Sequence, residues 1–525
     1  MRALGDQDRD PASPTYGCFD RRYWAWKIVD CPEATYQRHV YPLAMLVRDP
    51  ASRFYNRSDV LEAIQAGVTF AIAVQHRNGS FDQAFPFEQS WGATAFLLHP
   101  LLTAFEVTKP LVGKDVDRIS DRLAASAVFL RRERERHGTI TNHLAGGALS
   151  LSCAGRALGD RASSDAAASL VAAIIASQSE EGWFPEYGGA DPGYQSLCLY
   201  YLAEISRIAP SAPLTAAMTR AIEFLQWFVH PDGTFGGLYG SRRTRIAYPA
   251  GFALLAPESP RAASIAAALL AAAADEQTVT VTTIDAGNLA PLLTNVVRCL
   301  SAPLPASTPD LPRDRAGSCI DFPEAGLHVR STARYYAVVG SGNGGTLTVF
   351  DRRDRTRMKD DGGYAGLLGD GRLVTSQVTA AARVAAGSSS ITVDAQFSEM
   401  RRRAPSPWQF VLLRLLNLTV MRNIAVGNAV KRAIVARLMA PQARIPLSVS
   451  RTFVFGERIE IHDRLANPSG LRVQWMRAGV PFNAVHMASA GYYEGASLSA
   501  PVPAAIDIDA AQLSGSRTAE WSGEL

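Results

Sequence analysis

The stretch "SQSEEGWFPEYGGADPGYQSLCLYYLAEISR", residues 177–207, joins a glycine turn, a polar loop and an apolar helical segment. A helical pattern precedes Gly182, and glycine commonly ends a helix because it adopts the left-handed conformation there. The loop that follows carries carboxylates and phenols: Glu186, Tyr187, Asp191 and Tyr194. Such a polar loop directly before a buried helix predicts a repeated structural unit with functional groups in its connections.

Three other segments repeat this polar-glycine-x-apolar pattern. They are "NGSF", "HGTI" and "DGTF", so that the four glycines are Gly79, Gly138, Gly182 and Gly233, with spacings of 59, 44 and 51 residues. A period near fifty residues suits two helices and their loops, which indicates an array of helical hairpins. If the array closes into an α/α toroid, the loops after the four glycines share one rim and face a central cavity.

The composition is that of a globular protein with more than one domain. Of its residues, 47% are hydrophobic and 19% are charged, as in ordinary globular proteins. A chain of 525 residues is too long for one hydrophobic core. With 53 basic and 49 acidic residues its net charge is +4. This mild charge argues against a nucleic-acid partner.

The residue composition and the hydrophobic pattern change near residue 300. Ala/Leu-rich helical segments dominate before it, a proline-rich segment follows, and β-branched and aromatic runs separated by turn residues come after that. We therefore expect an α+β multidomain protein with an N-terminal α/α toroid over residues 20–300 and a linker over 301–315. A C-terminal antiparallel β-sandwich is expected over 316–525, with a helical insertion near 405–440.

The expected rim loops carry an unusual set of polar residues. They are Glu88, Gln89, Asn142, His143, Glu186, Tyr187, Asp191, Tyr194, Gln195, Arg242, Arg243, Arg245 and Tyr248. Removing the weakly acidic C5 proton of a uronic acid requires a donor that neutralises the neighbouring carboxylate and a base with a suitable pKa. Asparagine or arginine can supply the donor and tyrosine or histidine the base, so this residue set favours elimination chemistry on an acidic sugar.

The arrangement resembles the heparinase II/III-like and alginate-lyase-like polysaccharide lyases, in which a toroid precedes a β-sandwich. The dipeptide Asn142-His143 at the start of a rim helix is similar to the Asn-His pair of that family. The resemblance implies that Asn142 contacts the substrate carboxylate and that His143 is a candidate base. It also implies a catalytic tyrosine on the next rim helix, for which Tyr194 is the best match and Tyr187 the second.

The same resemblance implies a histidine that reaches the cleft from the sandwich. His486, in "FNAVHMASAGYYEG", is the best candidate and His462, in "EIHDRL", the second. The implied activity is β-elimination on a uronic-acid-containing polysaccharide, in polysaccharide biosynthesis or processing. No cofactor or metal is expected, because the six cysteines are scattered and form no ligand-like spacing.

Other functions fit the same residues. A uronyl C5-epimerase would abstract the same proton and return it to the other face. Glu186 and Asp191 could instead be the acid and base of an (α/α) glycoside hydrolase. A glycan-binding protein without activity, or a terpene-cyclase-like toroid, are further alternatives, although the acidic motif of the cyclases is absent.

Several expected substrate contacts also have structural explanations. Arg242, Arg243 and Arg245 beside a glycine-rich loop favour an anionic ligand, but they would also suit a solvated loop. Asn142 could cap its helix, and Tyr187 and Tyr194 could be core tyrosines with satisfied hydroxyls. Tyr248 is a further candidate for contact with substrate. The remaining candidates for contact with sugars are Glu88, Gln89, Trp183, Trp24, Trp26 and Trp91.

The sequence shows neither a signal peptide nor an apolar run of the ~20 residues needed for a membrane span. We therefore expect a cytoplasmic protein. No acidic residue lies between Glu399 and Glu457, whereas residues 401–451 contain many arginines among apolar residues. This pattern predicts either peripheral contact with an anionic membrane or a helical insertion packed on the toroid with a solvated basic edge.

Overall fold

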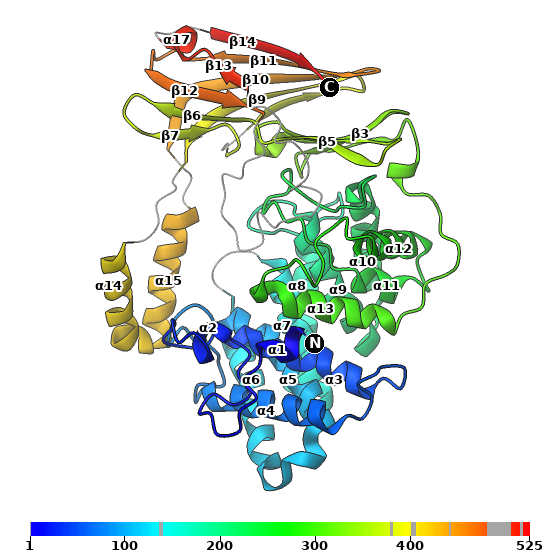
Figure 1. Ribbon diagram of the computed structural model, residues 1–525, viewed down its shortest axis with the longest axis vertical. Coiled ribbons are helices and arrows are strands. Elements are labelled where there is room, and N and C mark those ends of the chain that lie inside the picture. The colour runs from blue at the N-terminus through cyan, green and yellow to red at the C-terminus, as the bar shows by residue number, and fades with distance from the viewer. Residues whose placement is uncertain are drawn as a thin grey trace.

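The computed structural model describes residues 2–135, 140–378, 382–400, 406–439, 443–479, 506–514 and 518–525. Helices make up the chain as far as residue 300, and strands follow from residue 319. Figure 1 shows the helical part below and the sheets above it. Within the described residues before 300, β-type pairing consists of isolated antiparallel bridges such as Phe81 with Ser90, rather than strands.

One set of helices contacts its neighbours in a closed series. Each helix of this set contacts the next one along the chain, and the last also contacts the first. The set comprises α3 (Val40–Arg48), α5 (Trp91–Val112), α7 (Thr141–Leu158), α9 (Pro192–Ile208), α11 (Ala250–Leu255) and α13 (Ala286–Leu300). Because α13 contacts α3, these helices surround a common axis.

A second set of helices alternates with the first along the chain, and its members contact one another in order. It comprises α4 (Ser58–Val74), α6 (Val116–Arg132), α8 (Arg161–Ser177), α10 (Ala212–Leu225) and α12 (Pro260–Ala274). The N-terminal segment adds α1 (Arg2–Asp6), α2 (Arg21–Trp24) and the 3-10 helix η1 (Ala34–His39).

Three of the four repeated glycines form the same turn. Gly79, Gly182 and Gly233 have φ values of 91°, 96° and 83°, which L-residues with a side chain rarely adopt. In each turn the glycine N–H donates to the carbonyl three residues earlier, and that earlier residue donates to the carbonyl after the glycine. Gly138 lies outside the described residues. The sequence repeat therefore reflects a structural constraint at the end of each helix.

The first five strands form one antiparallel sheet in sequence order. They are β1 (Cys319–Phe322), β2 (Leu327–Ser331), β3 (Tyr335–Gly340), β4 (Thr346–Asp351) and β5 (Thr356–Asp361). Alternate residues of β3 face opposite sides: Tyr336 and Val338 join the core of the helical part, whereas Tyr335 and Val339 pack against the second sheet. This sheet is therefore covered on both faces.

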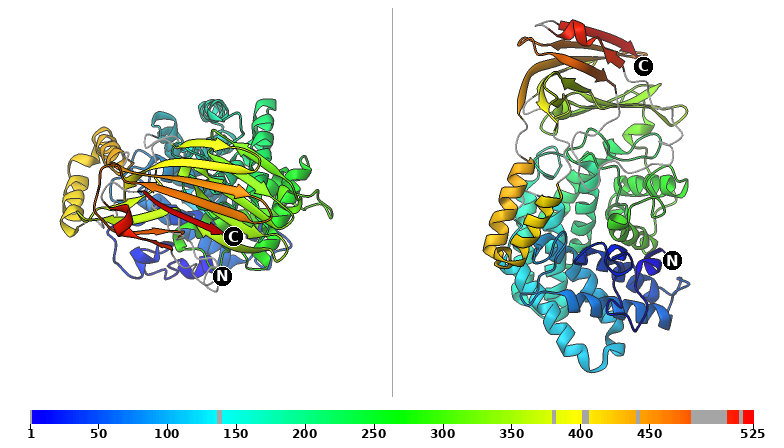
Figure 2. Two further views of the ribbon diagram at one scale, coloured as in Figure 1. Left: turned by 90° about the horizontal axis from the view of Figure 1, so that it is seen from above. Right: turned by 60° about the vertical axis from the view of Figure 1, so that its left-hand side comes forward.

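The second sheet has nine strands in the order β13-β12-β6-β7-β9-β10-β11-β14, with β8 paired to β9, and its pairings are antiparallel. The strands are β6 (Tyr364–Leu368), β7 (Leu373–Thr375), β8 (Arg383–Ala386), β9 (Ser390–Glu399), β10 (Arg444–Phe455), β11 (Ile459–Ala466), β12 (Val473–Ala478), β13 (Ile506–Ile508) and β14 (Thr518–Glu524). Figure 2 shows its strands crossing above the helical part.

A buried arginine joins the two sheets. Arg451 of β10 is fully buried and pairs with Asp361 of β5 at 3.0 Å and with Asp463 of β11 at 3.1 Å. A buried guanidinium is tolerated only when paired and hydrogen bonded. Its two carboxylate partners, one in each sheet, therefore fix how the sheets pack.

Helices α14 (Pro407–Leu418) and α15 (Ile424–Met439) interrupt the second sheet between β9 and β10. Ser406 starts α14 with a capping box, in which its side chain accepts from the Gln409 N–H and the Gln409 side chain accepts from the Ser406 N–H. Figure 1 shows the two helices beside the helical part, away from the sheet that they interrupt.

The repeated turn can be tested by adding one methyl group. A Cβ at Gly182 would lie 2.3 Å from the Arg220 carbonyl oxygen, whereas a Cβ at Gly188, also at positive φ (85°), would have open space around it. We expect Gly182→Ala to lower the free energy of unfolding by about 3 kcal/mol and Gly188→Ala by about 1 kcal/mol. Urea denaturation of both variants measures the difference, and equal losses would contradict the proposed clash.

Candidate functional site

The start of α7 and the loop before α9 meet through a buried carboxylate. The Asn142 backbone N–H donates to Glu186 Oε1 at 2.9 Å, and Asn142 Nδ2 donates to Oε1 and Oε2 at 3.0 and 2.9 Å. Both residues are buried. The amide of Asn142 therefore holds a carboxylate of the protein itself.

A guanidinium lies on the other side of Glu186. Arg242 Nη1 is 3.8 Å from Glu186 Oε2. Burial raises the pKa of Glu186 to about 7, although Arg242 and Asn142 act in the opposite direction by stabilising the charged form. Glu186 thus changes its charge near neutral pH while it is enclosed by the protein.

Asp191 connects the loop before α9 to the loop before α11. Its Oδ1 accepts from the Tyr194 N–H at 3.0 Å, which caps α9, and its Oδ2 accepts from the N–H groups of Arg242 and Thr244 at 3.0 and 3.2 Å. The carboxylate is fully buried. The sequence predicted that Asp191 contacts the substrate. In the structure its carboxylate oxygens instead accept hydrogen bonds from three backbone N–H groups.

Arg242 stacks on two tyrosines. Its Cζ lies 3.8 Å from the ring centroid of Tyr194 and 4.9 Å from that of Tyr187. Tyr187 has a φ of 55°, which is uncommon for a residue with a side chain and turns its ring toward the arginine. Burial raises the pKa of Tyr187, and the positive charge of Arg242 opposes this rise. Two phenols and one guanidinium therefore form a compact polar group.

His143 has a carboxylate partner that the sequence did not suggest. Its Nδ1 lies 2.9 Å from Glu135 Oε2, and its ring meets the edge of Phe96 at a centroid distance of 5.0 Å. The guanidinium of Arg38 lies over the ring of Phe96, with its Cζ 5.4 Å from the ring centroid. Glu135 belongs to the charge run "RRERERHG", which resembles a solvated helix end, and Arg38 and Phe96 lie in segments without a motif.

The predicted anion-binding residues Arg243, Arg245 and Tyr248 have other partners. Arg245 Nη2 pairs with Asp360 Oδ2 of β5 at 2.5 Å, and Arg243 Nη2 donates to the Gln377 carbonyl at 3.3 Å. Burial lowers the pKa of Arg243 to about 10 and raises that of the buried Tyr248. These contacts correct the expectation for all three, since the two arginines fasten the rim loop to the sheet part and Tyr248 belongs to the core.

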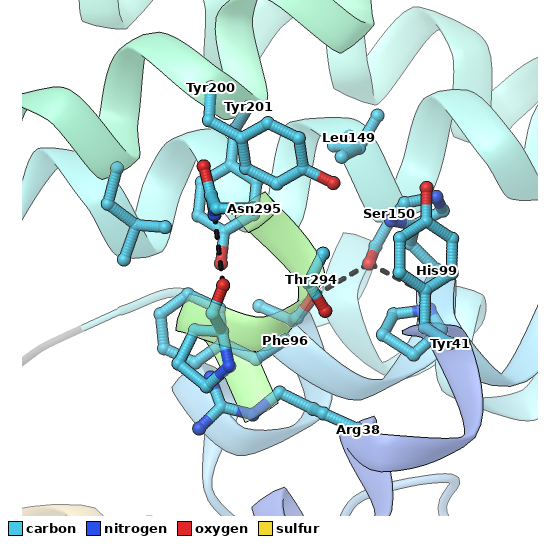
Figure 3. A pocket seen from close by; sticks show the side chains of 15 residues that line it. Arg38, Tyr41, Phe96, His99, Leu149, Ser150, Tyr200, Tyr201, Thr294 and Asn295 are labelled. Carbon is cyan, nitrogen blue, oxygen red and sulfur yellow. Dashed lines mark hydrogen bonds between the residues drawn. The ribbon is translucent and has the colours of Figure 1, made fainter. Parts of the chain in front are cut away.

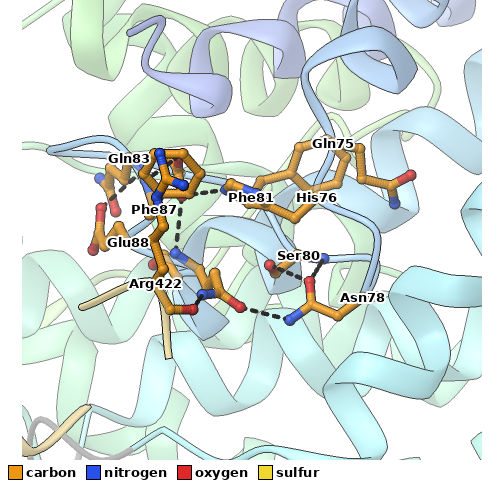
Figure 4. A network of polar contacts seen from close by, with 12 residues as sticks. Gln75, His76, Asn78, Ser80, Phe81, Gln83, Phe87, Glu88 and Arg422 are labelled. Atoms are coloured by element: carbon orange, nitrogen blue, oxygen red, sulfur yellow. Dashed lines mark hydrogen bonds and ion pairs between the residues drawn. The ribbon is translucent and has the colours of Figure 1, made fainter. Parts of the chain in front are cut away.

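Glu88 and Gln89 hold the helical insertion. Glu88 Oε2 accepts from the N–H groups of Gln83 and Ala84 at 2.9 and 2.6 Å, while its Oε1 lies 3.9 Å from Lys431 Nζ. Gln89 Nε2 donates to the Arg422 carbonyl at 3.0 Å. Figure 4 shows this network around the loop that precedes α5. The expected substrate contacts are thus replaced by contacts to α15 and the turn before it.

The other aromatic and histidine candidates do not join the cluster around Arg242. The indole N–H groups of Trp183, Trp91 and Trp24 donate to Glu181, Leu130 and Asp6 respectively. Gln195 is buried and donates to the Gly182 carbonyl, which secures the glycine turn. His462 is exposed beside Glu460 on β11, and His486 lies outside the described residues.

The axis of the helical ring is filled with side chains. A cavity of about 30 Å³ remains there, enough for water but not for a sugar. Figure 3 shows its lining, with Ser150 bonded to α5 and Asn295 bonded within α13. This cavity therefore has no room for a polysaccharide. Of the residues described above, Tyr187 and His143 are half-buried and Arg242 is buried.

The described residues contain no group of three or more His, Cys, Asp or Glu side chains that could hold a metal ion. The side chains brought together here are an amide bonded to a carboxylate, a histidine–carboxylate pair, two phenols and a guanidinium. This set can bind an anion and transfer protons.

No family model matches the sequence, and no curated protein matches it. Solved structures do match its fold. A xanthan lyase of Paenibacillus is 11% identical with a TM-score of 0.53, covering 91% of this chain and 45% of that chain. The chondroitin AC lyase of Streptomyces coelicolor A3, in complex with chondroitin sulphate, is 12% identical with a TM-score of 0.53, covering 91% of this chain and 70% of that one.

These likenesses show the fold of the chain. It is the fold of polysaccharide lyases, as the resemblance in the sequence indicated. The chain spans less than half of the xanthan lyase structure.

The buried position of Glu186 predicts a specific pH dependence. Its pKa of about 7 in the folded protein lies above the usual glutamate value of 4.5, so the folded state binds the proton more tightly. This group's contribution to stability is therefore present below about pH 4.5 and is lost as the pH rises toward 7. Glu186→Gln removes that loss, so we expect the variant to gain stability relative to wild type between pH 5 and pH 8, by up to about 3 kcal/mol.

Chemical denaturation of both proteins across this range measures the gain. The comparison between variant and wild type cancels the other titrating groups. A stability difference that stays constant from pH 5 to pH 8 would contradict the shifted pKa of Glu186.

Proposed function

We propose that this protein is a polysaccharide lyase that cleaves a uronic-acid-containing polysaccharide by β-elimination. The single observation that carries the proposal is the stack of Arg242 on Tyr194 and Tyr187 at the rim of the helical ring. The lyase fold supports it, as does the chondroitin sulphate bound by the chondroitin AC lyase. In this proposal the helices form an α/α toroid and the two sheets a β-sandwich.

Arg242 is the group that neutralises the substrate carboxylate in this mechanism. A guanidinium presents planar, paired donors to a carboxylate, and its charge stabilises the enolate that forms when C5 loses its proton. Asn142 acts through Glu186, since its amide holds the carboxylate 3.8 Å from Arg242. This replaces the direct contact between Asn142 and substrate that the sequence resemblance implied.

Tyr194 is the proposed base. Its ring lies under the Arg242 guanidinium, and its hydroxyl oxygen, as the phenolate, accepts the C5 proton. The electron pair of the broken C–H bond forms the C4–C5 double bond, and the O4 linkage breaks with its electrons. O4 takes a proton from Tyr187 or from His143, whose ring is oriented by Glu135. The products are an unsaturated uronic acid and a shortened chain.

The alternative functions have less support. A C5-epimerase would use the same base and differ only in returning a proton to C5, so it stays the second candidate. A hydrolase would need Glu186 and Asp191 at the substrate, but the oxygens of both carboxylates accept hydrogen bonds from groups of the protein itself. A glycan-binding role would leave the paired phenols at the rim unexplained.

Phenylalanine at position 194 tests the base. Tyr194→Phe keeps the ring under Arg242 but removes the hydroxyl, so we expect turnover to fall by ~10²–10⁴. The assay follows the absorbance of the conjugated double bond, near ~232 nm for elimination products, with a panel of uronate polymers. Tyr200→Phe is the matched control, because Tyr200 lies on the same helix but lines the internal cavity, and its activity should stay near that of wild type.

The same panel distinguishes the alternatives. Deuterium from solvent at C5 without cleavage identifies an epimerase, and new reducing ends without absorbance identify a hydrolase. Full activity of Tyr194→Phe would refute the proposed role of Tyr194, whatever the activity of Tyr200→Phe.

The role of Arg242 predicts a separation of binding from turnover. Arg242→Lys keeps the charge but loses the planar group that stacks on both tyrosines, so we expect KM to rise by about tenfold and kcat to fall less. Arg261→Lys is the control, since Arg261 is a distant surface arginine that bonds to the Asp310 carbonyl. Unchanged KM in Arg242→Lys would show that Arg242 does not bind the substrate carboxylate.

A further inference from the structure

Helix α14 presents an apolar face to solvent. Its large apolar residues recur at helical spacing and include Trp408, which is 80% exposed. The exposed residues of this face are Trp408, Val411, Leu412, Leu415 and Leu418. Positions i, i+3, i+4 and i+7 lie on one side of a helix. In a globular protein such a side normally faces the core, whereas here it faces outward.

A second exposed apolar segment lies next to this helix although it is distant in sequence. Trp26 and Ile28 are 69% and 72% exposed. Arg414 of α14 pairs with Asp30 at 2.7 Å, which places the loop that contains Trp26 and Ile28 beside the helix. Two exposed tryptophans therefore belong to one surface, which we call the α14 surface: Trp26, Ile28 and the five residues of the α14 face.

This surface is held in place rather than left loose. Besides the Arg414–Asp30 pair, Lys431 of α15 is buried and bonds to the Glu88 carbonyl, and Arg422 lies 4.5 Å over the ring of Phe87. Figure 4 shows Arg422 reaching the loop before α5. The inward sides of the hairpin are thus occupied by polar contacts to the helical part, so the apolar side cannot turn inward to bury itself.

Most charged residues around the α14 surface are basic, and the acidic exceptions Asp30 and Glu33 lie in the segment that follows Ile28. No acidic residue occurs between Glu399 and Glu457, and the exposed Lys27, Arg422 and Arg432 lie on the same segments. Lys431 and Arg414 use the acidic partners Glu88 and Asp30, which leaves the surroundings of the apolar face basic. A basic border around exposed tryptophan and leucine matches the composition of helices that lie in the interface of an anionic bilayer.

We propose that the α14 surface docks the protein onto an anionic lipid bilayer, with α14 lying in the plane of the membrane interface. The helix has 12 residues, about 18 Å, so it cannot cross a bilayer. No helix in the described ranges is long and apolar enough to do so. The inference stands on the surface alone and is independent of the proposed lyase activity.

The other occupant to consider is a second copy of the chain. Stable dimers bury about 800 Å² on each partner, more than one side of a helix of about 18 Å provides. Two copies would also bring two basic borders together with no acid on α14 or α15 to pair them. A bilayer with anionic headgroups avoids both difficulties. Its interior accepts the apolar side chains, and its headgroups neutralise the basic residues around them.

Co-sedimentation of the full chain with lipid vesicles tests the proposal. We expect binding to phosphatidylcholine vesicles that contain about 30% phosphatidylglycerol, and weaker binding without the anionic lipid. The triple variant W408S/L412S/L415S and the double variant W26S/I28S should each lower the partition coefficient by about tenfold or more. Their secondary structure and thermal unfolding should match wild type, because the replaced side chains are exposed.

The control variant L111S/L300S replaces two exposed leucines elsewhere on the protein and should bind as wild type does. Equal losses in this control and in the triple variant would overturn the proposal, since they would indicate nonspecific adsorption. Absence of vesicle binding by wild type would also overturn it. Concentration-dependent dimers that the triple variant abolishes, measured by light scattering without lipid, would assign the α14 surface to self-association instead.

Discussion

The carboxylate of Asp191 is the contact on which the arrangement of the rim depends. It caps α9 through the Tyr194 N–H and binds the N–H groups of Arg242 and Thr244 from a loop about fifty residues later. Because buried backbone donors must be paired, this one side chain determines where the second loop lies against the first. The stacking of Arg242 on Tyr194 follows from that placement, so the reactive groups are positioned by a residue that does not itself face the rim.

The five-stranded sheet extends this constraint to the rest of the chain. Arg245 pairs with Asp360, and Asn343 donates to the carbonyls of Leu238 and Gly240, so both ends of the Arg242 loop are fastened to the sheet. The face of that sheet opposite the helices is covered by the nine-stranded sheet. A sheet buried on both sides cannot shift without exposing apolar surface to water, and the rim loop is therefore held on a rigid support.

The sequence predicted the helical and antiparallel parts because their signals are local. The glycine turns were recognisable because glycine adopts their φ values without strain. The partners of the rim residues were not predictable. Glu186 meets Asn142 across 44 residues, and Arg245 meets Asp360 across 115 residues. Polar residues at equivalent positions of the repeat resembled substrate contacts, whereas many of them satisfy one another.

The helical insertion connects the rim to the α14 surface through a series of side-chain contacts. Lys431 and Gln89 join α15 and the turn before it to the loop that precedes α5, and Phe96 of α5 meets His143 at the start of α7. No flexible linker separates these described elements along that path. A bilayer that received α14 would therefore set the orientation of the rim as well. An acidic polysaccharide would then approach a rim whose distance from the membrane is determined by the length of the hairpin and not by diffusion of a tethered domain.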